Sequence, residues 1–187
     1  MRVAILSIFY VMAIANLPKT IINFSKLTIN RYLGIKTMPN SIENIFNYLL
    51  IDDKIATGGQ PTEQQLAAIA DKGYQVVINL ALDTSTNALA DEKAIVEANR
   101  MQYIHIPVDF DRPTQEDFAL FSQAMQTYRE NIFVHCAANL RVSAFMYLYR
   151  TLYQNVGEAE AKQDLYKLWQ PNPTWQNLID TITTNKI

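Results

Sequence analysis

The chain has 187 residues, a length that suits one domain with a buried core. Hydrophobic residues make up 49% of it, which excludes a disordered protein, and a net charge of −2 without a basic run argues against a binder of nucleic acid or of anionic membranes. One cysteine and two histidines exclude an internal disulfide and leave too few ligands for a cysteine- or histidine-rich metal site, so we expect no metal and no cofactor.

The first residues have the pattern of a secretory signal peptide. Within residues 1–15, one arginine is followed by an apolar run that ends in the small-x-small sequence Ala-Ile-Ala. We expect cleavage after Ala15 and a periplasmic or secreted protein with no stable membrane span; an uncleaved anchor and a buried first helix are the alternatives. Residues 16–40 show no regular period and are expected to form a leader or linker, which leaves residues 41–187 as the folded domain.

From residue 41 onward, short apolar segments alternate with amphipathic stretches. The short segments are rich in β-branched residues, which is typical of buried strands, and the amphipathic stretches repeat apolar residues with the helical period. Thr62 and Thr114 each begin a capping box, a threonine followed three residues later by glutamine or aspartate. In chain order, the predicted elements are a helix over 42–49, a strand over 54–57, a helix over 62–73, a strand over 76–80, a helix over 90–100, a strand over 103–108, a helix over 114–128, a strand over 132–134, and helices over 141–154, 157–169 and 174–184.

This alternation predicts an α/β fold, a mostly parallel central sheet flanked by helices in three layers. Pro107 predicts that the strand over 103–108 lies at a sheet edge or reaches its end there. In such folds, ligands bind beyond the carboxyl ends of the strands, so we expect the functional residues in the loops that follow them.

The segment over 133–143 carries the residues with the most chemistry. Cys136 follows a buried strand, and a short loop leads to Arg141 at the start of a strongly apolar helix. Loop N–H groups, the positive end of the helix and a guanidinium can together bind a phosphate or sulfate, and the same positive field favours a nucleophilic thiolate. An inert buried cysteine is the alternative, and His135 is expected to order the loop rather than to act as an acid or base. The expected oxyanion-binding residues are Ala137, Ala138, Asn139, Leu140, Arg141 and Ser143.

The pair His135-Cys136, followed by Arg141, resembles the signature loop of cysteine-dependent phosphatases of the dual-specificity fold. More specifically, residues from about 41 to 180 resemble the bacterial beta-lactamase hydrolase-like phosphatase family. The resemblance implies a phosphatase-like α/β fold and hydrolysis of phosphate esters through a phosphocysteine. The segments that carry it are Gly59-Gln60-Pro61-Thr62, Val77-Ile78-Asn79-Leu80, Tyr103-Ile104-His105-Ile106-Pro107-Val108 and the cysteine loop.

The cysteine loop departs from the usual phosphatase pattern in its spacing. Four residues separate Cys136 from Arg141 where that pattern has five, yet Ser143 keeps the expected offset and Val142 stands in the usual arginine position. Asn139 stands where a glycine is usual, and asparagine tolerates the left-handed conformation that such a turn needs. A loop of this length also occurs in rhodanese-like sulfurtransferases.

A phosphatase also needs a general acid that protonates the leaving oxygen. Asp109 and Asp111 follow a predicted strand, in a position that resembles the acid loop of the dual-specificity fold. Asp109 is preferred because it is nearer the strand end. The alternative is that both aspartates only form a turn ahead of the next helix.

Three functions follow from these residues. The leading hypothesis is a phosphatase in which Cys136 attacks phosphorus, Arg141 and the loop bind the phosphate, and Asp109 or Asp111 is the acid. The second is a rhodanese-like sulfurtransferase that uses a Cys136 persulfide, and the third is an inactive module that binds an oxyanion. Each takes a phosphate- or sulfate-containing partner; the natural substrate and the oligomeric state are left open.

Other polar and aromatic residues are expected to have ordinary structural roles. Asp83, Asp91 and Glu92 lie in or beside a polar loop and are expected to be solvated, since they lack metal-ligand spacing. Trp169 and Trp175 flank two prolines and are expected to pack around a turn between the last two helices.

Overall fold

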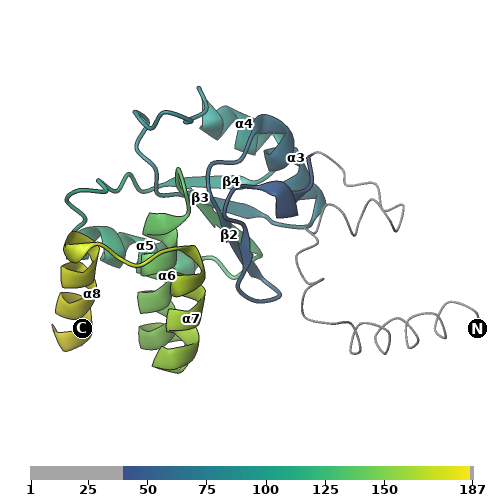
Figure 1. Ribbon diagram of the computed structural model, residues 1–187. Helices are drawn as coiled ribbons and strands as arrows, with labels where there is room; N and C mark the ends of the chain where they lie inside the picture. The colour runs from purple at the N-terminus through teal and green to yellow at the C-terminus, as the bar shows by residue number, and fades with distance from the viewer. Residues whose placement is uncertain (1–39, 186–187) are drawn as a thin grey trace, which may run out of the picture. The chain divides into compact units, whose positions relative to one another are not determined.

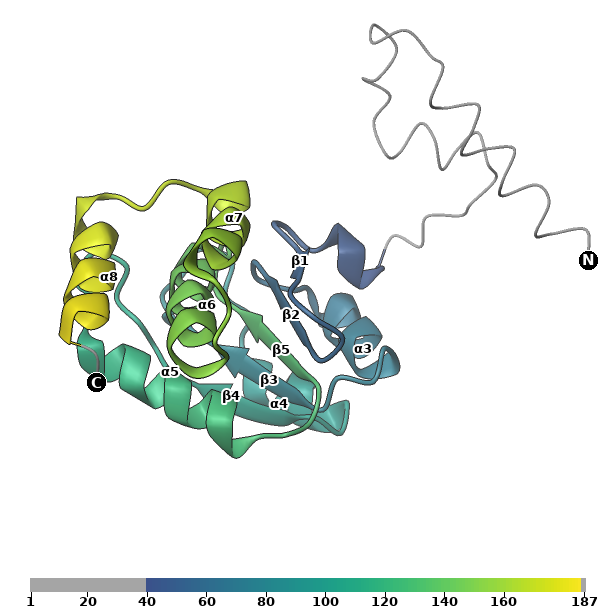
Figure 2. The same cartoon turned by 90° about the horizontal axis from the view of Figure 1, so that it is seen from below.

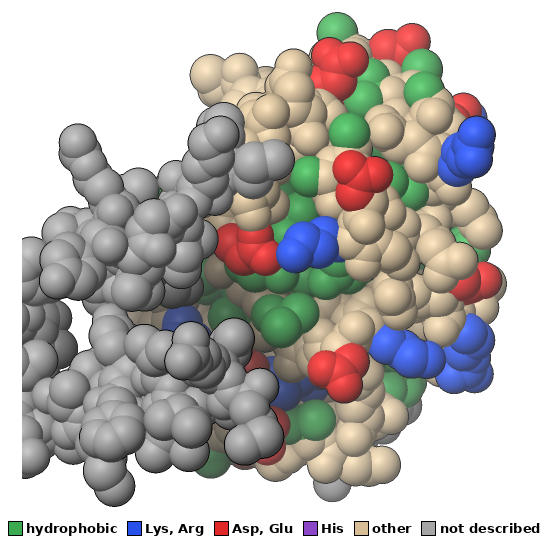
Figure 3. All heavy atoms as spheres, turned by 90° about the vertical axis from the view of Figure 1, so that its right-hand side faces the viewer, with side chains coloured by type: hydrophobic (Ala, Val, Ile, Leu, Met, Phe, Trp, Pro, Cys, Tyr) green, Lys and Arg blue, Asp and Glu red, His purple; other side chains and the backbone are tan. Residues whose placement is uncertain are grey.

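The computed structural model describes residues 40–185, which form a central sheet with helices on both faces (Figure 1). The predicted signal peptide and nearly all of the predicted leader lie outside the described residues. Within the described part of the chain, no helix is both long enough and apolar enough to cross a membrane. On the face shown in Figure 3, acidic and basic side chains are interspersed rather than gathered into one patch.

The sheet has five strands in the order β1-β2-β5-β3-β4. The pairs β2–β5, β5–β3 and β3–β4 are parallel, whereas the short β1 is antiparallel to β2, so the prediction of a mostly parallel sheet is confirmed. β4, which ends two residues before Pro107, is an edge strand as the proline predicted. The strands cover Leu49–Leu50 (β1), Ile55–Gly58 (β2), Val76–Asn79 (β3), Gln102–His105 (β4) and Ile132–His135 (β5).

Helices cover both faces of the sheet and make the three predicted layers (Figure 2). One face packs its core on α3, α4 and the short 3-10 helix η2, and the other packs on α5, α6, α7 and α8. Residues 141–150 of α6 are all buried, which confirms the central position that its apolar sequence predicts. The helices cover Ile42–Asn44 (η2), Glu63–Asp71 (α3), Glu92–Ala98 (α4), Gln115–Thr127 (α5), Leu140–Tyr153 (α6), Glu158–Leu168 (α7) and Pro173–Asn185 (α8).

Both predicted capping boxes are present. The hydroxyls of Thr62 and Thr114 accept hydrogen bonds from the N–H groups of Gln65 and Asp117, whose side chains accept in return from the threonine N–H groups. A cap of this kind is worth about 1 kcal/mol. Gly73 follows α3 with φ +88°, a left-handed conformation that stops a helix and that glycine adopts without strain.

Two expectations were wrong. The helix predicted over 42–49 is only the 3-10 turn η2, and Leu49–Leu50 instead pairs with β2, because a strand edge can take up the backbone groups there. Glu92 is not solvated: it is only 6% exposed, because α4 directs it inward over the strand ends.

The expectation for the two tryptophans is confirmed. Trp169 and Trp175 pack against each other and Trp175 is fully buried, as expected of the turn between α7 and α8.

The four parallel strands end in one row. Gly58 of β2 lies opposite His135 of β5, which lies opposite Asn79 of β3, which lies opposite His105 of β4. Because side chains alternate along a strand, His135, Asn79 and His105 all face the α3/α4 layer. Cys136, the first residue after β5, belongs to the core on the opposite face of the sheet, beneath α5 and α6.

Candidate active site

Cys136 lies directly after β5 with its side chain turned into the core. It is 1% exposed, and its N–H donates to the carbonyl oxygen of Gly58 at 3.4 Å. The chain then makes a tight turn and enters α6 at Leu140. The thiol therefore stands where the sequence predicted it, between a buried strand and the amino end of a long helix, and the helix dipole favours negative charge at that end.

Asn139 makes this turn possible. Its φ of +63° is left-handed, so the conformation expected of a residue in place of glycine is observed. Its side-chain NH₂ donates to the carbonyl oxygen of Asn47 at 2.7 Å and to the hydroxyl of Thr57 at 2.9 Å. In return, the side chain of Asn47 donates to the carbonyl oxygen of Ala138 at 2.9 Å. We call the reciprocal pair Asn47 and Asn139 the asparagine clasp; it fastens the cysteine loop to the segments around β1 and β2.

The Gly-Gln-Pro-Thr segment packs directly on the cysteine loop. Gly59 forms an isolated antiparallel bridge with Ala138, and the N–H of Gln60 donates to the carbonyl oxygen of Ala137 at 3.2 Å. A Cβ on Gly59 would lie 3.0 Å from that same Ala137 oxygen and 3.0 Å from the carbonyl oxygen of Phe46. Glycine is therefore favoured here, because a Cβ at this position would crowd the backbones of the cysteine loop and of Phe46.

Arg141 lies under the loop rather than in solvent. It is 8% exposed, its Nη1 donates to the carbonyl oxygen of Leu80 at 2.8 Å, and its guanidinium lies 5.9 Å from the ring centre of Phe110. Its Nε is buried without a hydrogen-bond partner among the described residues. Part of the guanidinium thus holds the loop after β3, while other donors remain for a ligand.

Ser143 lies one turn into α6. Its hydroxyl donates to the carbonyl oxygen of Leu140 at 2.8 Å and accepts from the indole N–H of Trp169 at 3.0 Å. Trp169 also stacks at a tilt on Phe110, the residue beneath the Arg141 guanidinium. The segment between α7 and α8, through Trp169, therefore holds the first turn of α6 in place.

Of the two candidate acids, Asp109 is held as a carboxylate. It accepts from the N–H of Asp111 at 2.9 Å and from Arg112 at 3.0 Å, and these bonds lower the pKa of Asp109. A general acid needs the opposite shift, because it must carry a proton near neutral pH. Asp111 is exposed, and its carboxylate makes no hydrogen bond to another described residue.

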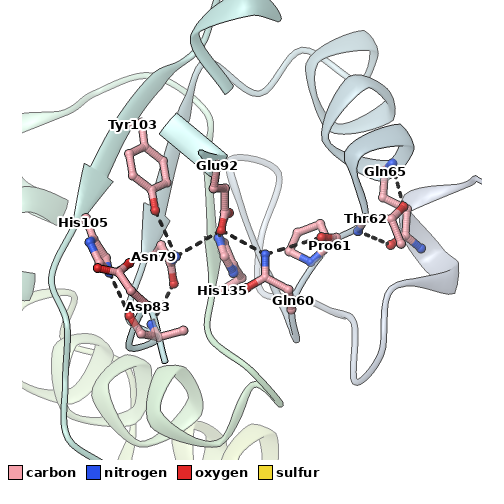
Figure 4. Close-up of polar contacts among 11 residues, drawn as sticks. Gln60, Pro61, Thr62, Gln65, Asn79, Asp83, Glu92, Tyr103, His105 and His135 are labelled. Carbon is pink, nitrogen blue, oxygen red and sulfur yellow. Dashed lines mark hydrogen bonds and ion pairs between the residues drawn. The ribbon is translucent and has the colours of Figure 1, made fainter. Parts of the chain in front are cut away.

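A polar cluster lies on the other side of the strand ends (Figure 4). Oε1 of Glu92 lies 2.7 Å from Nε2 of the fully buried His135, and Oε2 accepts from Gln60 and Asn79 at 3.0 Å and 3.2 Å. Asn79 also donates to the hydroxyl of Tyr103 at 3.0 Å. Burial alone would raise the pKa of Glu92, but contact with His135 and the bond from Gln60 outweigh burial and lower it.

The cluster opens to a cleft of about 390 Å³ between the loop after β3 and the end of β4. Tyr103, His105 and Glu92 contribute to its lining. Asn87, on the same loop, donates to the carbonyl oxygen of Ala137 at 3.2 Å. The cleft and the cysteine loop are therefore joined through one loop. Within residues 40–185, no group of three acidic, histidine or cysteine side chains has the arrangement of a metal site.

Sequence reasoning found the cysteine loop but missed the groups that hold it. Glu92 looked like an ordinary acidic residue at a helix start, and nothing near it in the sequence indicates that it meets His135. Asn47 likewise lies in a segment that was predicted to be helical, and its φ of +52° is one more left-handed asparagine. The one available signal was the asparagine itself, which is common in left-handed turns.

Comparison with known proteins agrees with this geometry. Residues 32–176 match the family described as a DSP-PTPase phosphatase fused to NAD+ kinase. A candidate phosphatase (DUF442) of Shewanella putrefaciens CN-32 is 33% identical, with a TM-score of 0.71 over 79% of this chain and 98% of that chain. TpbA of P. aeruginosa, solved in complex with pTyr, has the same fold at 14% identity, with a TM-score of 0.58 over 75% of this chain and 90% of that one.

A beta-lactamase hydrolase-like protein of Xylella fastidiosa is 29% identical over 94 residues, which are 49% of this chain and 22% of that protein. The chain thus spans about a fifth of the length of the curated relatives it matches. The family model and the neighbours in structure are those of dual-specificity and tyrosine phosphatases, which supports a phosphatase-like function. The chain therefore belongs to the bacterial family of dual-specificity-phosphatase-like proteins, as its cysteine loop and Gly-Gln-Pro-Thr segment predicted.

Proposed function

We propose that this domain hydrolyses phosphate monoesters through a phosphocysteine on Cys136. The observation that carries the proposal is the position of Cys136 at the end of β5, one turn before the amino end of α6. The family to which the chain belongs supports the same chemistry. The helix end and the Arg141 guanidinium supply positive charge for a phosphate dianion.

The reaction would take two steps. In the first, the Cys136 thiolate forms a bond to phosphorus, the bond to the leaving oxygen breaks, and an acid gives that oxygen a proton. In the second, water gives a proton to the carboxylate left by that acid and attacks phosphorus, the sulfur–phosphorus bond breaks, and inorganic phosphate leaves with the thiolate and the acid restored. Both steps pass through a negatively charged phosphoryl group, which the loop N–H groups and Arg141 would stabilise.

Of the two aspartates, we favour Asp111 as the acid. Asp109 is tied to Arg112 and its pKa is lowered, whereas the carboxylate of Asp111 is exposed and makes no such bond among the described residues. This reverses the preference that sequence position alone suggested.

The test compares hydrolysis of p-nitrophenyl phosphate and of phenyl phosphate by the full chain. Cys136→Ser should reduce both rates to background, and equal rates in the two proteins would remove the mechanism. Asp111→Asn should slow phenyl phosphate more than p-nitrophenyl phosphate by at least about tenfold, because the poorer leaving group depends more on the acid. Asp109→Asn is the matched control; if it alone has this effect, Asp109 is the acid.

A second function has its own supporting observation, the short loop. Only four residues separate Cys136 from Arg141, and sulfur transfer would need no acid to protonate a leaving oxygen. The Cys136 thiolate would attack the outer sulfur of thiosulfate, the sulfur–sulfur bond would break and sulfite would leave. Cyanide would then take the sulfane sulfur as thiocyanate and restore the thiolate.

Mass spectrometry separates the two functions. After thiosulfate treatment, a sulfurtransferase would gain the mass of one sulfur atom on Cys136 and would produce thiocyanate when cyanide is added. An unmodified thiol with no thiocyanate would leave phosphate ester hydrolysis as the proposed chemistry. Binding of phosphate or sulfate without either reaction would assign the domain to oxyanion binding alone.

A further inference from the structure

A buried carboxylate lies across the sheet from the candidate nucleophile. Glu92 begins α4 and is 6% exposed, and its Oε1 lies 2.7 Å from Nε2 of His135, whose ring is completely buried. A carboxylate withdrawn from water is costly unless it is paired and hydrogen-bonded. His135 is the residue immediately before Cys136, so the partner of this charge is covalently attached to the nucleophile.

The second oxygen of Glu92 joins the other strand ends. Oε2 accepts from Gln60, which follows β2, and from Asn79, the last residue of β3. β2 and β3 are the two neighbours of β5 in the sheet. A single carboxylate therefore contacts residues at the carboxyl ends of three neighbouring strands, β2, β5 and β3, beside the cysteine loop, as Figure 4 shows for the side chains involved.

We propose that Glu92 is a positioning residue for Cys136 and acts through His135. The inference rests on the proposed use of Cys136 as the nucleophile. The ion-pair contact of 2.7 Å between Oε1 of Glu92 and Nε2 of His135 places the carboxylate where it would hold a proton on Nε2, and neither atom has another hydrogen-bond partner among the described residues. Because β5 ends at His135, a fixed ring also fixes the direction in which the chain leaves the strand. The N–H groups of the cysteine loop can converge near the thiolate only if the chain leaves β5 in that direction.

Other titratable groups surround the pair. On the Glu92 side, the same cleft is lined by Tyr103 and His105 of β4, by Asp91 and Lys93 next to Glu92, and by Asp83, whose Oδ1 lies 3.8 Å from Nε2 of His105. Burial raises the pKa of Tyr103 to about 12, so its hydroxyl is neutral in the neutral range. On the thiol side, Arg141 contributes a permanent positive charge. Burial alone would raise the pKa of Glu92, but contact with His135 and the hydrogen bond from Gln60 together outweigh burial, so the pKa is lowered and Glu92 remains ionised.

The pH at which Cys136 ionises tests the proposal without any turnover. The chain has one cysteine, so the ultraviolet absorbance of its thiolate, corrected with the same protein carrying Cys136→Ser, reports that atom alone. Glu92→Gln keeps the shape of the side chain but removes its charge. We expect the midpoint to move up by about one pH unit, a tenfold loss of thiolate, because the loop amides no longer converge. Glu97→Gln, an exposed carboxylate on the same helix, should leave the midpoint unchanged.

Any outcome other than an upward shift of the Cys136 midpoint overturns the proposal. An unchanged midpoint, even in a less stable variant, would make Glu92 purely structural. A shift to lower pH would mean that direct repulsion between Glu92 and the thiolate dominates. If Glu92→Gln does not fold, His135→Gln must give the upward shift; if both fold, the double variant must shift no further than either single one.

A measurement on the otherwise unchanged chain adds an independent check. The protein has two histidines, so His105→Gln leaves the ring signals of His135 alone in the nuclear magnetic resonance spectrum. A slowly exchanging Nε2 proton is expected, and its absence would overturn the proposal. Failure of the domain to hydrolyse phosphate esters would count against the proposed function only, since neither measurement depends on catalysis.

Discussion

Two effects at Asn139, its left-handed backbone and its side-chain hydrogen bonds, should each contribute a separately measurable part of the free energy of unfolding. Asn139→Ala would force a residue with a Cβ and no polar group into φ +63°, at a cost of about 1 kcal/mol. It would also remove the two bonds to Asn47 and Thr57, each worth about 1 kcal/mol. We therefore expect Asn139→Ala to lower the free energy of unfolding by about 3 kcal/mol.

Asn139→Gly separates the two contributions. Glycine adopts the left-handed conformation freely, so only the hydrogen bonds are lost and the expected cost is about 2 kcal/mol. Asn155 is the matched control, because it has φ +55° but an exposed side chain. There, alanine should cost about 1 kcal/mol and glycine almost nothing.

Urea denaturation followed by circular dichroism measures all four variants, provided that the slope with denaturant stays that of the unchanged chain. Wild-type stability in Asn139→Gly would refute a stabilising role for the clasp. Equal costs for alanine and glycine at both positions would refute the argument from backbone strain. The corresponding loss in Tm for Asn139→Ala is roughly 6–12 °C for a chain of this size.

Two further predictions concern other parts of the domain. Gly59→Ala should lower the free energy of unfolding by about 1–3 kcal/mol in a urea titration and weaken phosphate or sulfate binding in calorimetry, because the added Cβ would press on the cysteine loop. A Cβ at Gly157 would meet nothing within 4 Å, so the control Gly157→Ala should change the free energy of unfolding by at most about 0.5 kcal/mol. Equal costs for the two variants would contradict the close approach at Gly59. Partial burial alone would raise the pKa of Asp164, but hydrogen bonds from Lys167 and Arg150 outweigh burial and lower the pKa. The ionised Asp164 therefore stabilises the fold fully above its unfolded pKa of about 3.9, and this stabilisation is lost as the pH falls through the lower folded pKa. Asp164→Asn should therefore be less stable at pH 7 and equal to the unchanged chain at the acid end, and a constant difference across that range would rule out the pair as its source.

The elements that the sequence predicted correctly are those with local causes. Thr62 and Thr114 cap their helices with partners three residues away, and the apolar run of α6 needs no knowledge of its neighbours to be placed centrally. The left-handed turn at Asn139 also follows from the residue itself. Such features depend on spacing within one segment, which a single sequence contains.

The features that were missed depend on partners far away along the chain. Glu92 at the start of a helix has the sequence of a solvated acid, and only the strand order brings it to His135. The two-residue β1 is a strand only because β2 offers an unpaired edge. Spacing predicted the candidate nucleophile, Cys136, but the residues that support it come from separate segments, including the turn before β1, the ends of β2 and β3 and the start of α4, and could not be derived from spacing.

The asparagine clasp also bears on the order in which the chain folds. Its bonds join residues 91 and 92 positions apart, so they close a long stretch of chain. The cysteine loop can reach its final shape only after β2 has paired with β5 and carried the preceding turn into place. A fragment that begins after Asn47 would keep the thiol and the guanidinium but lack the support for the loop between them. The shape of the loop proposed to bind an oxyanion should therefore be among the last features that the folding chain acquires.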